Sequence, residues 1–233
     1  MGVILSAHQP AYLPWLGYFD KIARADVFVF LDTVQFEKNS FINRNKIKTA
    51  QGPQWLTIPV RVKGHIQASL RETLIDDTQP WRSKHLKSLE MNYRKAPGFK
   101  ECFPKIEQLF SIQQSNLAEL CWQQLRFWVT EFRINTRIVR ASEFQITSRK
   151  SQLILDLCQH FGAGKYLSGA MGRNYLDEDL FADSGMTIDY QDFRHPAYPQ
   201  LWGNFEPYMC IVDYWMNCGS DIQHVLTGKW HEF

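Results

Sequence analysis

The sequence contains few cysteines, and none has the spacing of a metal or redox site. Its five cysteines form no Cys-x-x-Cys pair and no such pair followed by His-x-x-x-His, which disfavours the common zinc-binding designs. An odd number of unpaired cysteines is typical of reduced, buried thiols in a cytosolic protein. We therefore expect no metal site and a cytoplasmic location.

Long apolar runs and a strong excess of one charge are also lacking. No stretch has the length that crosses a bilayer, and no basic segment followed by a long apolar run opens the chain, so neither membrane insertion nor a secretory leader is expected. The net charge of +2 is too small to indicate a polyanionic partner. Nucleic acid is therefore not expected as a partner.

The short motifs of several large enzyme classes are missing as well. The 233 residues contain no Gly-x-Ser-x-Gly, P-loop, Gly-x-Gly-x-x-Gly or His-Glu-x-x-His. These absences disfavour the usual hydrolase, nucleoside triphosphatase, dinucleotide-binding and zinc-protease designs. What the chain does have is aromatic side chains, at 14% with eight Trp, which suit a bulky core or surfaces that stack on a ring-shaped ligand.

Short apolar runs alternate with helical patterns along the chain. The runs that read as buried strands lie at residues 3–8, 27–32, 136–142, 165–169 and 186–193. Helical periodicity dominates residues 79–132. We predict a single α/β domain over residues 1–233, with a mostly parallel, Rossmann-like layered sheet and a helical insertion at about 79–132.

Three other segments complete the prediction. Residues 33–52 are polar with scattered aromatics and are predicted to form a long, functional loop. Residues 55–62 alternate as a strand does, although Pro59 restricts them to a sheet edge or a bulge. The segment from Pro207 to Cys218 is predicted to be helical.

Polar side chains end nearly every predicted strand. In open α/β sheets ligands bind at the carboxyl ends of the strands, where this sequence places His8, Asp32, Ser142, Ser168, Gly169 and Asp192 ahead of His195. We expect His8 or His195 to act as acid or base, and Asp32 to orient a histidine or a ligand hydroxyl. Alternatively, His8 is a structural histidine that closes the first turn.

Further site candidates come from the first turn, from residues 33–52 and from two later segments. The basic side chains of residues 33–52 can clamp an anionic group, although a solvated basic loop has the same composition. The HPAYPQ segment at 195–200 repeats features of QPAYLP at 9–14, so one interpretation is that two similar aromatic turns face one pocket. The predicted substrate-binding residues are Gln9, Tyr12, Trp15, Gln35, Asn43, Arg44, Lys46, Ser168, Tyr198 and Gln200.

Two small residues each allow two interpretations. Gly17 lies early in a predicted helix, where glycine costs about 1 kcal/mol relative to alanine. Either the helix packs closely on the sheet there, or an anion approaches the helix N-terminus. Cys210 follows a possible helix start and is either a buried thiol or a nucleophile of lowered pKa.

Five ordered motifs, spread over essentially the whole chain, together resemble the WbqC-like protein family. They are HQPAYLPWLGYFDK, DTVQFEKNSFINRNKIK, WLTIPV, YLSG, and HPAYPQ followed by FEPYMCIVDYWMNCG. Cys210 stands where the family pattern leads us to expect a serine. The resemblance implies a bacterial protein associated with gene clusters for O-antigen and other surface polysaccharides, for which a role as glycyl or acyl transferase to an amino sugar has been proposed.

Three functions stay open at this level. The first is an amide-forming transferase that acts on an amino sugar or nucleotide-sugar, with CoA or an acyl carrier protein as thioester donor. The second is an ATP-dependent adenylating ligase with a nucleotidylyltransferase-like site, which would need Mg²⁺. The third is a non-catalytic protein that binds a sugar nucleotide or a carrier protein.

Overall fold

The computed structural model describes residues 2–61 and 69–226. Five strands form one sheet in the order β5-β2-β1-β6-β7. They are β1 (Val3–His8), β2 (Val27–Phe30), β5 (Arg137–Arg140), β6 (Ala163–Ser168) and β7 (Thr187–Tyr190). Each neighbouring pair is parallel, which confirms the predicted Rossmann-like α/β sheet.

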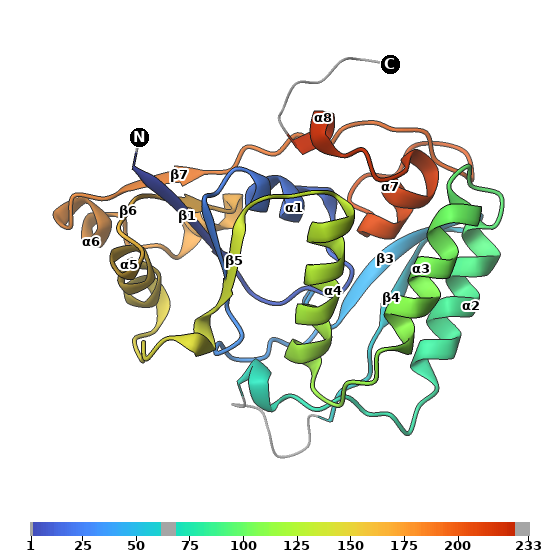
Figure 1. The fold of residues 1–233 in the computed structure, drawn as a ribbon, viewed down its shortest axis with the longest axis horizontal. Helices are drawn as coiled ribbons and strands as arrows, with labels where there is room; N and C mark the ends of the chain where they lie inside the picture. The colour runs from blue at the N-terminus through green and yellow to red at the C-terminus, as the bar shows by residue number, and fades with distance from the viewer. Residues whose placement is uncertain (1, 62–68, 227–233) are drawn as a thin grey trace.

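Helices cover both faces of this sheet (Figure 1). They include α1 (Leu16–Ala23), α4 (Leu117–Glu131), α5 (Lys150–His160) and α6 (Glu178–Asp183). Along β2, Val27 and Val29 pack in the cluster that contains α5 and α6, whereas Phe28 and Phe30 pack in the cluster that contains α1 and α4. Successive strand residues point to opposite faces. Because both faces are covered, β2 is a continuous apolar run.

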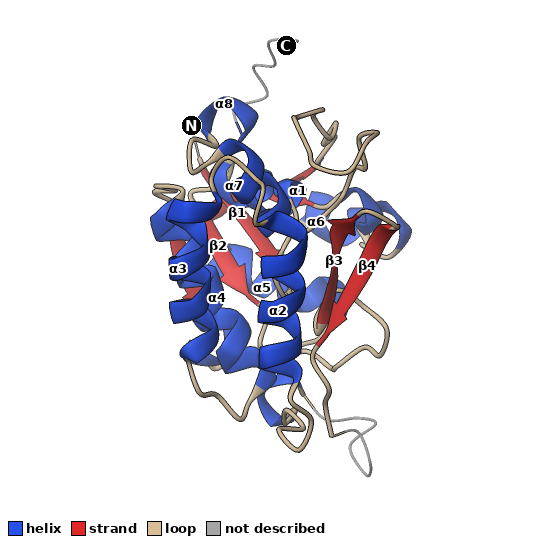
Figure 2. Cartoon of the chain, turned by 90° about the vertical axis from the view of Figure 1, so that its right-hand side faces the viewer, coloured by secondary structure: helices blue, strands red, loops and turns tan. Residues whose placement is uncertain are grey.

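The helical segment expected at residues 79–132 is confirmed. It consists of α2 (Trp81–Tyr93), α3 (Phe99–Ser111) and α4, and Figure 2 shows α2, α3 and α4 as neighbouring helices on one side of the molecule. The chain turns between α2 and α3 at Gly98, where an added Cβ would lie 2.9 Å from the carbonyl oxygen of Met216. Glycine therefore lets this turn pack closely on the C-terminal helix.

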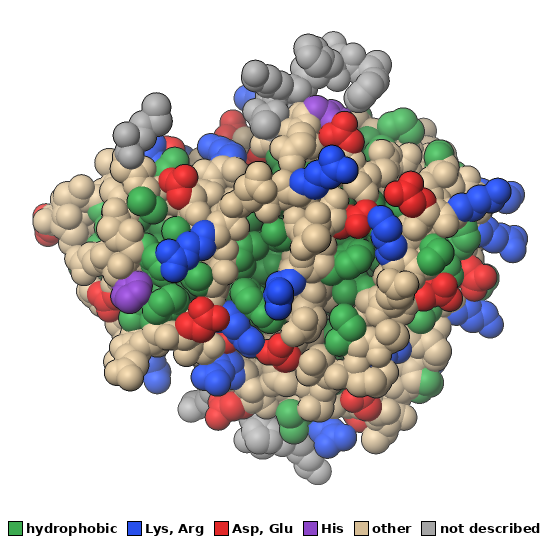
Figure 3. All heavy atoms as spheres, viewed as in Figure 1, with side chains coloured by type: hydrophobic (Ala, Val, Ile, Leu, Met, Phe, Trp, Pro, Cys, Tyr) green, Lys and Arg blue, Asp and Glu red, His purple; other side chains and the backbone are tan. Residues whose placement is uncertain are grey.

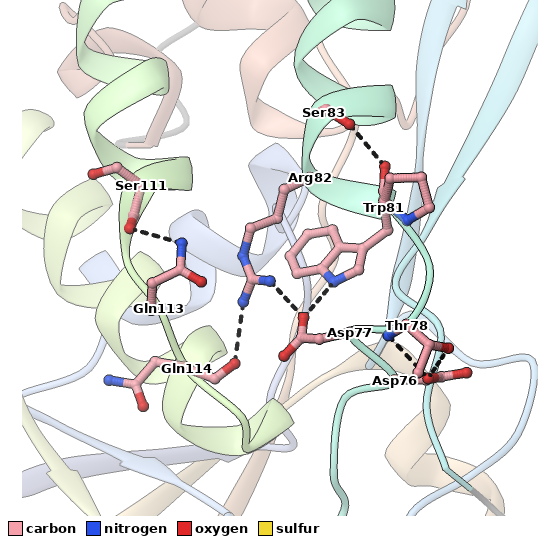
Figure 4. Close-up of polar contacts among 10 residues, drawn as sticks. Asp76, Asp77, Thr78, Trp81, Arg82, Ser83, Ser111, Gln113 and Gln114 are labelled. Atoms are coloured by element: carbon pink, nitrogen blue, oxygen red, sulfur yellow. Dashed lines mark hydrogen bonds and ion pairs between the residues drawn. The ribbon is translucent and has the colours of Figure 1, made fainter.

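The start of α2 is anchored by a polar cluster (Figure 4). The Asp77 carboxylate accepts hydrogen bonds from the Trp81 indole nitrogen, at 3.2 Å, and from the Arg82 guanidinium. Arg82 also donates to the carbonyl of Gln114 at 3.1 Å. These bonds join the first turn of α2 to the segment between α3 and α4.

The predicted loop at residues 33–52 is wrong in its second half. Residues 44–49 form β3 (Arg44–Thr49), which pairs with β4 (Gly52–Thr57) as an antiparallel hairpin. Gly52 has a φ of +101°, a conformation that glycine adopts without steric cost. β3 reads RNKIKT and contains a single apolar residue, Ile47, so it lacks the alternation that marks a strand, and its buried Lys48 shows that a long aliphatic stem tolerates burial. β4 also begins earlier than predicted and ends before Pro59.

The C-terminal helix starts later than predicted. Its first residue is Ile211, so α7 (Ile211–Cys218) begins four residues after Pro207, and α8 (Gln223–Leu226) follows. Within the described ranges, no helix is long and apolar enough to cross a membrane. Figure 3 shows acidic and basic side chains interspersed over one face of the molecule, so neither sign dominates that face.

Candidate active site

The strand ends named from the sequence lie along one edge of the sheet. Because the strands are parallel, His8 at the end of β1 and Ser168 at the end of β6 lie at the same edge. Asp32 and Ser142 follow β2 and β5 at that edge and are hydrogen bonded to each other. This is the edge at which open α/β sheets bind ligands.

The His8 ring has one nitrogen fixed by the main chain. Its Nδ1 lies 2.8 Å from the carbonyl oxygen of Gln9, and a carbonyl can only accept, so Nδ1 carries the hydrogen and Nε2 keeps its lone pair. The ring packs edge-on against Trp15 at 5.8 Å and Tyr18 at 4.9 Å between centroids. Burial, and secondly the charge of Lys21, lower the pKa of His8 to about 3. His8 is therefore neutral at pH 7 and a weak base.

Lys21 on α1 is a site candidate that the sequence did not reveal. Its side chain is buried, and Nζ donates to the carbonyl of Ala7 at 3.0 Å. Burial lowers the pKa of Lys21 to about 7. The apolar spacing of Phe19 and Ile22 placed Lys21 off the core-facing stripe, but every residue from 16 to 22 is buried. Helical periodicity could not show that α1 is covered on all sides.

Gly17 is explained by close packing. An added Cβ would lie 2.9 Å from both Phe193 Cδ1 and Trp15 Nε1, closer than real Cβ atoms come to other heavy atoms. The segment that carries Phe193 therefore lies directly on the first turn of α1. Gly17 is thus explained by close packing, but against Trp15 and the segment after β7 rather than against the sheet, and the contact gives no support to an anion at the helix N-terminus.

A run of aromatic rings leads from the sheet edge to the surface. Trp15 lies 5.3 Å from Phe41, and Phe41 lies 5.8 Å from Trp55, between ring centroids. Phe41 and Trp55 are each 40% exposed. The Arg44 guanidinium lies 4.3 Å and Lys46 Nζ 5.2 Å from the centre of the Trp55 ring. We call these five residues the aromatic run. It brings the predicted binding residues Trp15, Arg44 and Lys46 together with Phe41 and Trp55, which the sequence did not single out.

Three predicted substrate-binding residues are buried in the framework. The Tyr12 hydroxyl is hydrogen bonded to His85 Nδ1 at 2.8 Å. Asn43 Nδ2 donates to the carbonyl of Ile58 at 2.8 Å. Ser168 is also buried, and its hydroxyl donates to the carbonyl of Gly169 at 3.1 Å. These bonds hold the turns around the site in place.

Gln9 and Gln35 have more exposed positions. Gln9 is half-buried, and its carbonyl accepts the His8 hydrogen bond. Gln35 is exposed and forms an isolated antiparallel bridge with Ser69. Gln9 thus adjoins the His8 ring, and Gln35 lies at the bridge to Ser69.

Asp32 is hydrogen bonded to Arg140, the last residue of β5, and to Ser142, just after β5. Its fully buried carboxylate accepts from the Ser142 hydroxyl at 2.6 Å, the Ser142 amide at 3.0 Å and Arg140 Nε at 3.2 Å. Among the described residues, no hydrogen bond joins Asp32 to His8. The carboxylate ties the ends of β2 and β5 together beside the site.

Tyr198 and Gln200 converge on a carboxylate that the sequence analysis missed. Asp213, fully buried on α7, accepts from Tyr198 at 2.8 Å, from Gln200 at 2.7 Å and from Tyr93 at 2.7 Å. Burial raises the pKa of Asp213, while the hydrogen bonds of Tyr93, Tyr198 and Gln200 act in the opposite direction. The sequence did not indicate that Asp213 accepts these three hydrogen bonds, because Tyr93, Tyr198 and Gln200 are distant from it in the chain.

His195 lies near the group formed by His8, Trp15 and Tyr18, and Phe193 lies between. Its Nδ1 lies 2.9 Å from the carbonyl of Pro196, and Nε2 is buried with no hydrogen-bond partner among the described residues. Burial lowers the pKa of His195. The ring contacts Phe193 at 5.8 Å, and Phe193 in turn packs on Gly17. The second aromatic turn therefore adjoins the first through Phe193.

Cys210 has the properties of a buried thiol. It occupies the N-cap position of α7, and its amide donates to the carbonyl of Lys46 at 2.8 Å. Burial raises the pKa of its thiol to about 12. A neutral thiol without exposed surface is a poor nucleophile, so the nucleophile interpretation has no support in the geometry.

A polar pocket of about 360 Å³ lies elsewhere, at the amino ends of β2 and β5, with Asp26, Arg133, Thr136 and Gln223 among its lining residues. The Asp26 carboxylate accepts from the amide of Ile4 at 2.8 Å, and Thr136 donates to a main-chain carbonyl. Several polar groups that line this pocket are thus already hydrogen bonded to main-chain groups. Over the described part of the chain, no group of three His, Cys, Asp or Glu side chains could hold a metal ion.

The parallel sheet and the polar edge define an α/β protein of the Rossmann-like layered class. Residues 9–225 match the model of the WbqC-like protein family, and the chain belongs to that family. It is 38% identical over 222 residues to Uncharacterized protein Rv1507c of Mycobacterium tuberculosis, over 94% of this chain and 95% of that protein. No solved structure matches the chain. The family expected from the five motifs is confirmed.

Proposed function

We propose that this protein is an amide-forming acyltransferase whose acceptor is an amino sugar carried on a nucleotide. The observation that carries the proposal is the aromatic run, in which the Arg44 and Lys46 cations lie against the Trp55 ring at one end and Trp15 lies beside His8 at the other. Aromatic faces suit sugar rings and nucleobases. Arg44 and Lys46 supply the bidentate and point-charge contacts that suit a diphosphate. The run thus provides a place for each part of a nucleotide-sugar.

In this proposal His8 binds the acceptor amine. Its Nε2 lone pair accepts a hydrogen from the amino group and aims the nitrogen at the donor carbonyl, so that orientation lowers the barrier. The donor is a thioester of CoA or of an acyl carrier protein. The carbon–nitrogen bond forms as the carbon–sulfur bond breaks, and the thiol leaves.

Family membership gives the proposal its setting. The WbqC-like resemblance implies work on bacterial surface polysaccharides such as O-antigen. The precursors of such polymers are nucleotide-sugars, which are the acceptors that the aromatic run suits. We place the reaction in the cytoplasm.

A binding screen followed by a product assay tests the proposal. The melting temperature of the protein is measured with a UDP- or dTDP-linked amino sugar, with acetyl-CoA and with ATP plus Mg²⁺. The reaction mixtures are then analysed for products by mass spectrometry. We expect the amino sugar to raise the melting temperature and acetyl-CoA to yield an N-acetylated sugar. His8→Ala should lose the product, whereas His160→Ala, an exposed histidine on α5, should retain it.

Two other results would replace the proposal. Stabilisation by ATP alone, with release of pyrophosphate, would indicate an adenylating ligase. Stabilisation by the sugar nucleotide with no product from any donor would indicate a binding protein.

A further inference from the structure

The amino group of Lys21 is buried without a carboxylate to pair with. Its side chain is 3% exposed, and Nζ donates to the carbonyl of Ala7. None of the ion pairs among the described residues includes Lys21. The neighbouring Asp20 is occupied, because Gln191 donates to its carboxylate at 2.6 Å and Arg24 lies 3.6 Å from it. Lysines are rarely buried to this extent unless their charge is paired.

Gly169 leaves room beside this amino group. It follows β6 at the same sheet edge and has a φ of −67° and a ψ of 159°, values that any residue adopts. Glycine is therefore not required there by the backbone. An added Cβ would meet a single atom within 4 Å, Lys21 Nζ at 3.9 Å. Gly169 is half-buried, so the absence of a side chain there leaves free the space next to the amine that a Cβ would take.

Few charged groups face Lys21. His8 on β1 is the titratable group that senses its charge. Asp20 on α1 is held by Gln191 and Arg24, and Arg173, beyond Gly169, packs its guanidinium 4.1 Å from the Tyr190 ring. Burial is thus the cause of the lowered pKa of about 7, which brings the titration of the amine close to neutral pH.

We propose that Lys21 is the proton acceptor of the transfer step, an assignment that rests on the proposed acyltransferase function. The nitrogen of the acceptor amine attacks the thioester carbonyl and forms the amide bond. The proton that this nitrogen releases goes to the Lys21 amine. The carbon–sulfur bond breaks, and Lys21 returns the proton to the leaving thiolate. Atoms and electrons balance with no further reactant.

Lys21 suits this task better than His8 does. A general base works best when its pKa lies near the working pH. Lys21 meets that condition, and His8, with a pKa of about 3, does not. His8 then positions the amine, while Lys21 accepts its proton.

Labelling of the intact protein tests the state of the amine without any substrate. The protein is treated with acetic anhydride between pH 5 and 11, and acetylation of Lys21 is followed by mass spectrometry, with exposed Lys84 on α2 as reference. We expect Lys21 to be acetylated with a midpoint near pH 7. No acetylation of Lys21 in the folded protein, or a midpoint near 10, the usual range for lysine, would overturn the assignment.

Turnover with the amino sugar and acetyl-CoA tests the role. We expect Lys21→Met to lower kcat at least about 100-fold, the range of general base catalysis, and to remove the rise of kcat with pH near 7. Lys21→Arg should not restore activity, because a guanidinium stays charged. Lys84→Met should match the wild type, and ethylamine should partly rescue Lys21→Ala.

The two hypotheses fail in different ways. Transfer that persists in Lys21→Met would overturn the assignment of Lys21 and leave the acyltransferase function intact. A neutral, reactive Lys21 in a protein that forms no amide would overturn the acyltransferase function and support Lys21 as the reactive amine of a different reaction.

Discussion

The Tyr198 hydroxyl donates a 2.8 Å hydrogen bond to Asp213, a carboxylate with no exposed surface. Tyr93 on α2 and Gln200 donate to the same carboxylate. Together these three hydrogen bonds fix the segment after β7 against α2 and α7. That segment carries His195 and Phe193 to the sheet edge. The buried Asp213 carboxylate therefore holds in place one of the segments that form the candidate active site.

Tyr198→Phe should destabilise the fold without abolishing binding. A hydrogen bond to a buried charged group contributes about 1.5–3 kcal/mol, and urea unfolding should show a loss of that size. Tyr208→Phe is the control, because Tyr208 is 51% exposed and should unfold as the wild type does. An unchanged unfolding midpoint together with a raised KM would instead indicate that Tyr198 contacts substrate.

Asp32→Ala should be more damaging than Tyr198→Phe. The substitution leaves Arg140, half-buried at the end of β5, without one of its two carboxylate partners and removes both bonds to Ser142. Loss of one partner of a buried pair costs about 3–5 kcal/mol, which denaturant unfolding would measure. Asp192→Ala, at an exposed carboxylate, is the control. A variant that unfolds normally but is inactive would favour direct participation of Asp32.

Arg44→Gln should weaken nucleotide-sugar binding about tenfold, or about 1.4 kcal/mol. The half-buried guanidinium beside Trp55 is predicted to contact phosphate, and ion contacts that are open to solvent are screened by salt. Calorimetric titration at low and high salt should therefore show a difference that shrinks as salt rises. Arg126→Gln, at an exposed position on α4, should bind normally. Equal affinities for wild type and Arg44→Gln would remove phosphate binding from the aromatic run.

Cys210→Ser should retain activity. The thiol is buried and protonated at neutral pH, since its pKa is raised to about 12, and serine is favoured at an N-cap position. Iodoacetamide at pH 8 should leave Cys210 unmodified, as peptide mass spectrometry would show. A loss of turnover beyond tenfold in a normally folded Cys210→Ser protein would restore the nucleophile interpretation.

The stability of the Lys21→Met variant relative to the wild type should depend on pH. The pKa of Lys21 falls from 10.5 in the unfolded chain to about 7 in the fold, so between these values the unfolded chain binds more protons. Wild-type stability then rises with pH across that window, by up to about 1.4 kcal/mol per unit. Lys21→Met lacks this contribution.

We therefore expect Lys21→Met to be most stable relative to the wild type near pH 7 and to lose that advantage toward pH 10. Urea unfolding at pH 7, 8.5 and 10 measures the difference, with Lys84→Met as the control. A difference that stays constant with pH would show that the fold does not lower the pKa of Lys21.

Local patterns of residues were enough to predict the layered sheet and the edge at which its polar residues gather. Apolar runs such as residues 27–30 and the helical period of residues 79–132 are local patterns, and parallel strands bring their carboxyl ends to one edge. The positions of His8, Asp32 and Ser168 followed from that order alone. The lysines of β3 concealed a strand, because their spacing resembles that of a basic loop.

Which of these side chains remain available for a ligand depends on how the chain folds. Tyr198 and Gln200 are bound to Asp213, Asp32 is bound to Ser142 and Arg140, and Lys21 is buried where helical periodicity pointed it outward. The physical reason is that hydrogen-bond partners and burial depend on segments distant in the chain, which no local pattern of residues encodes.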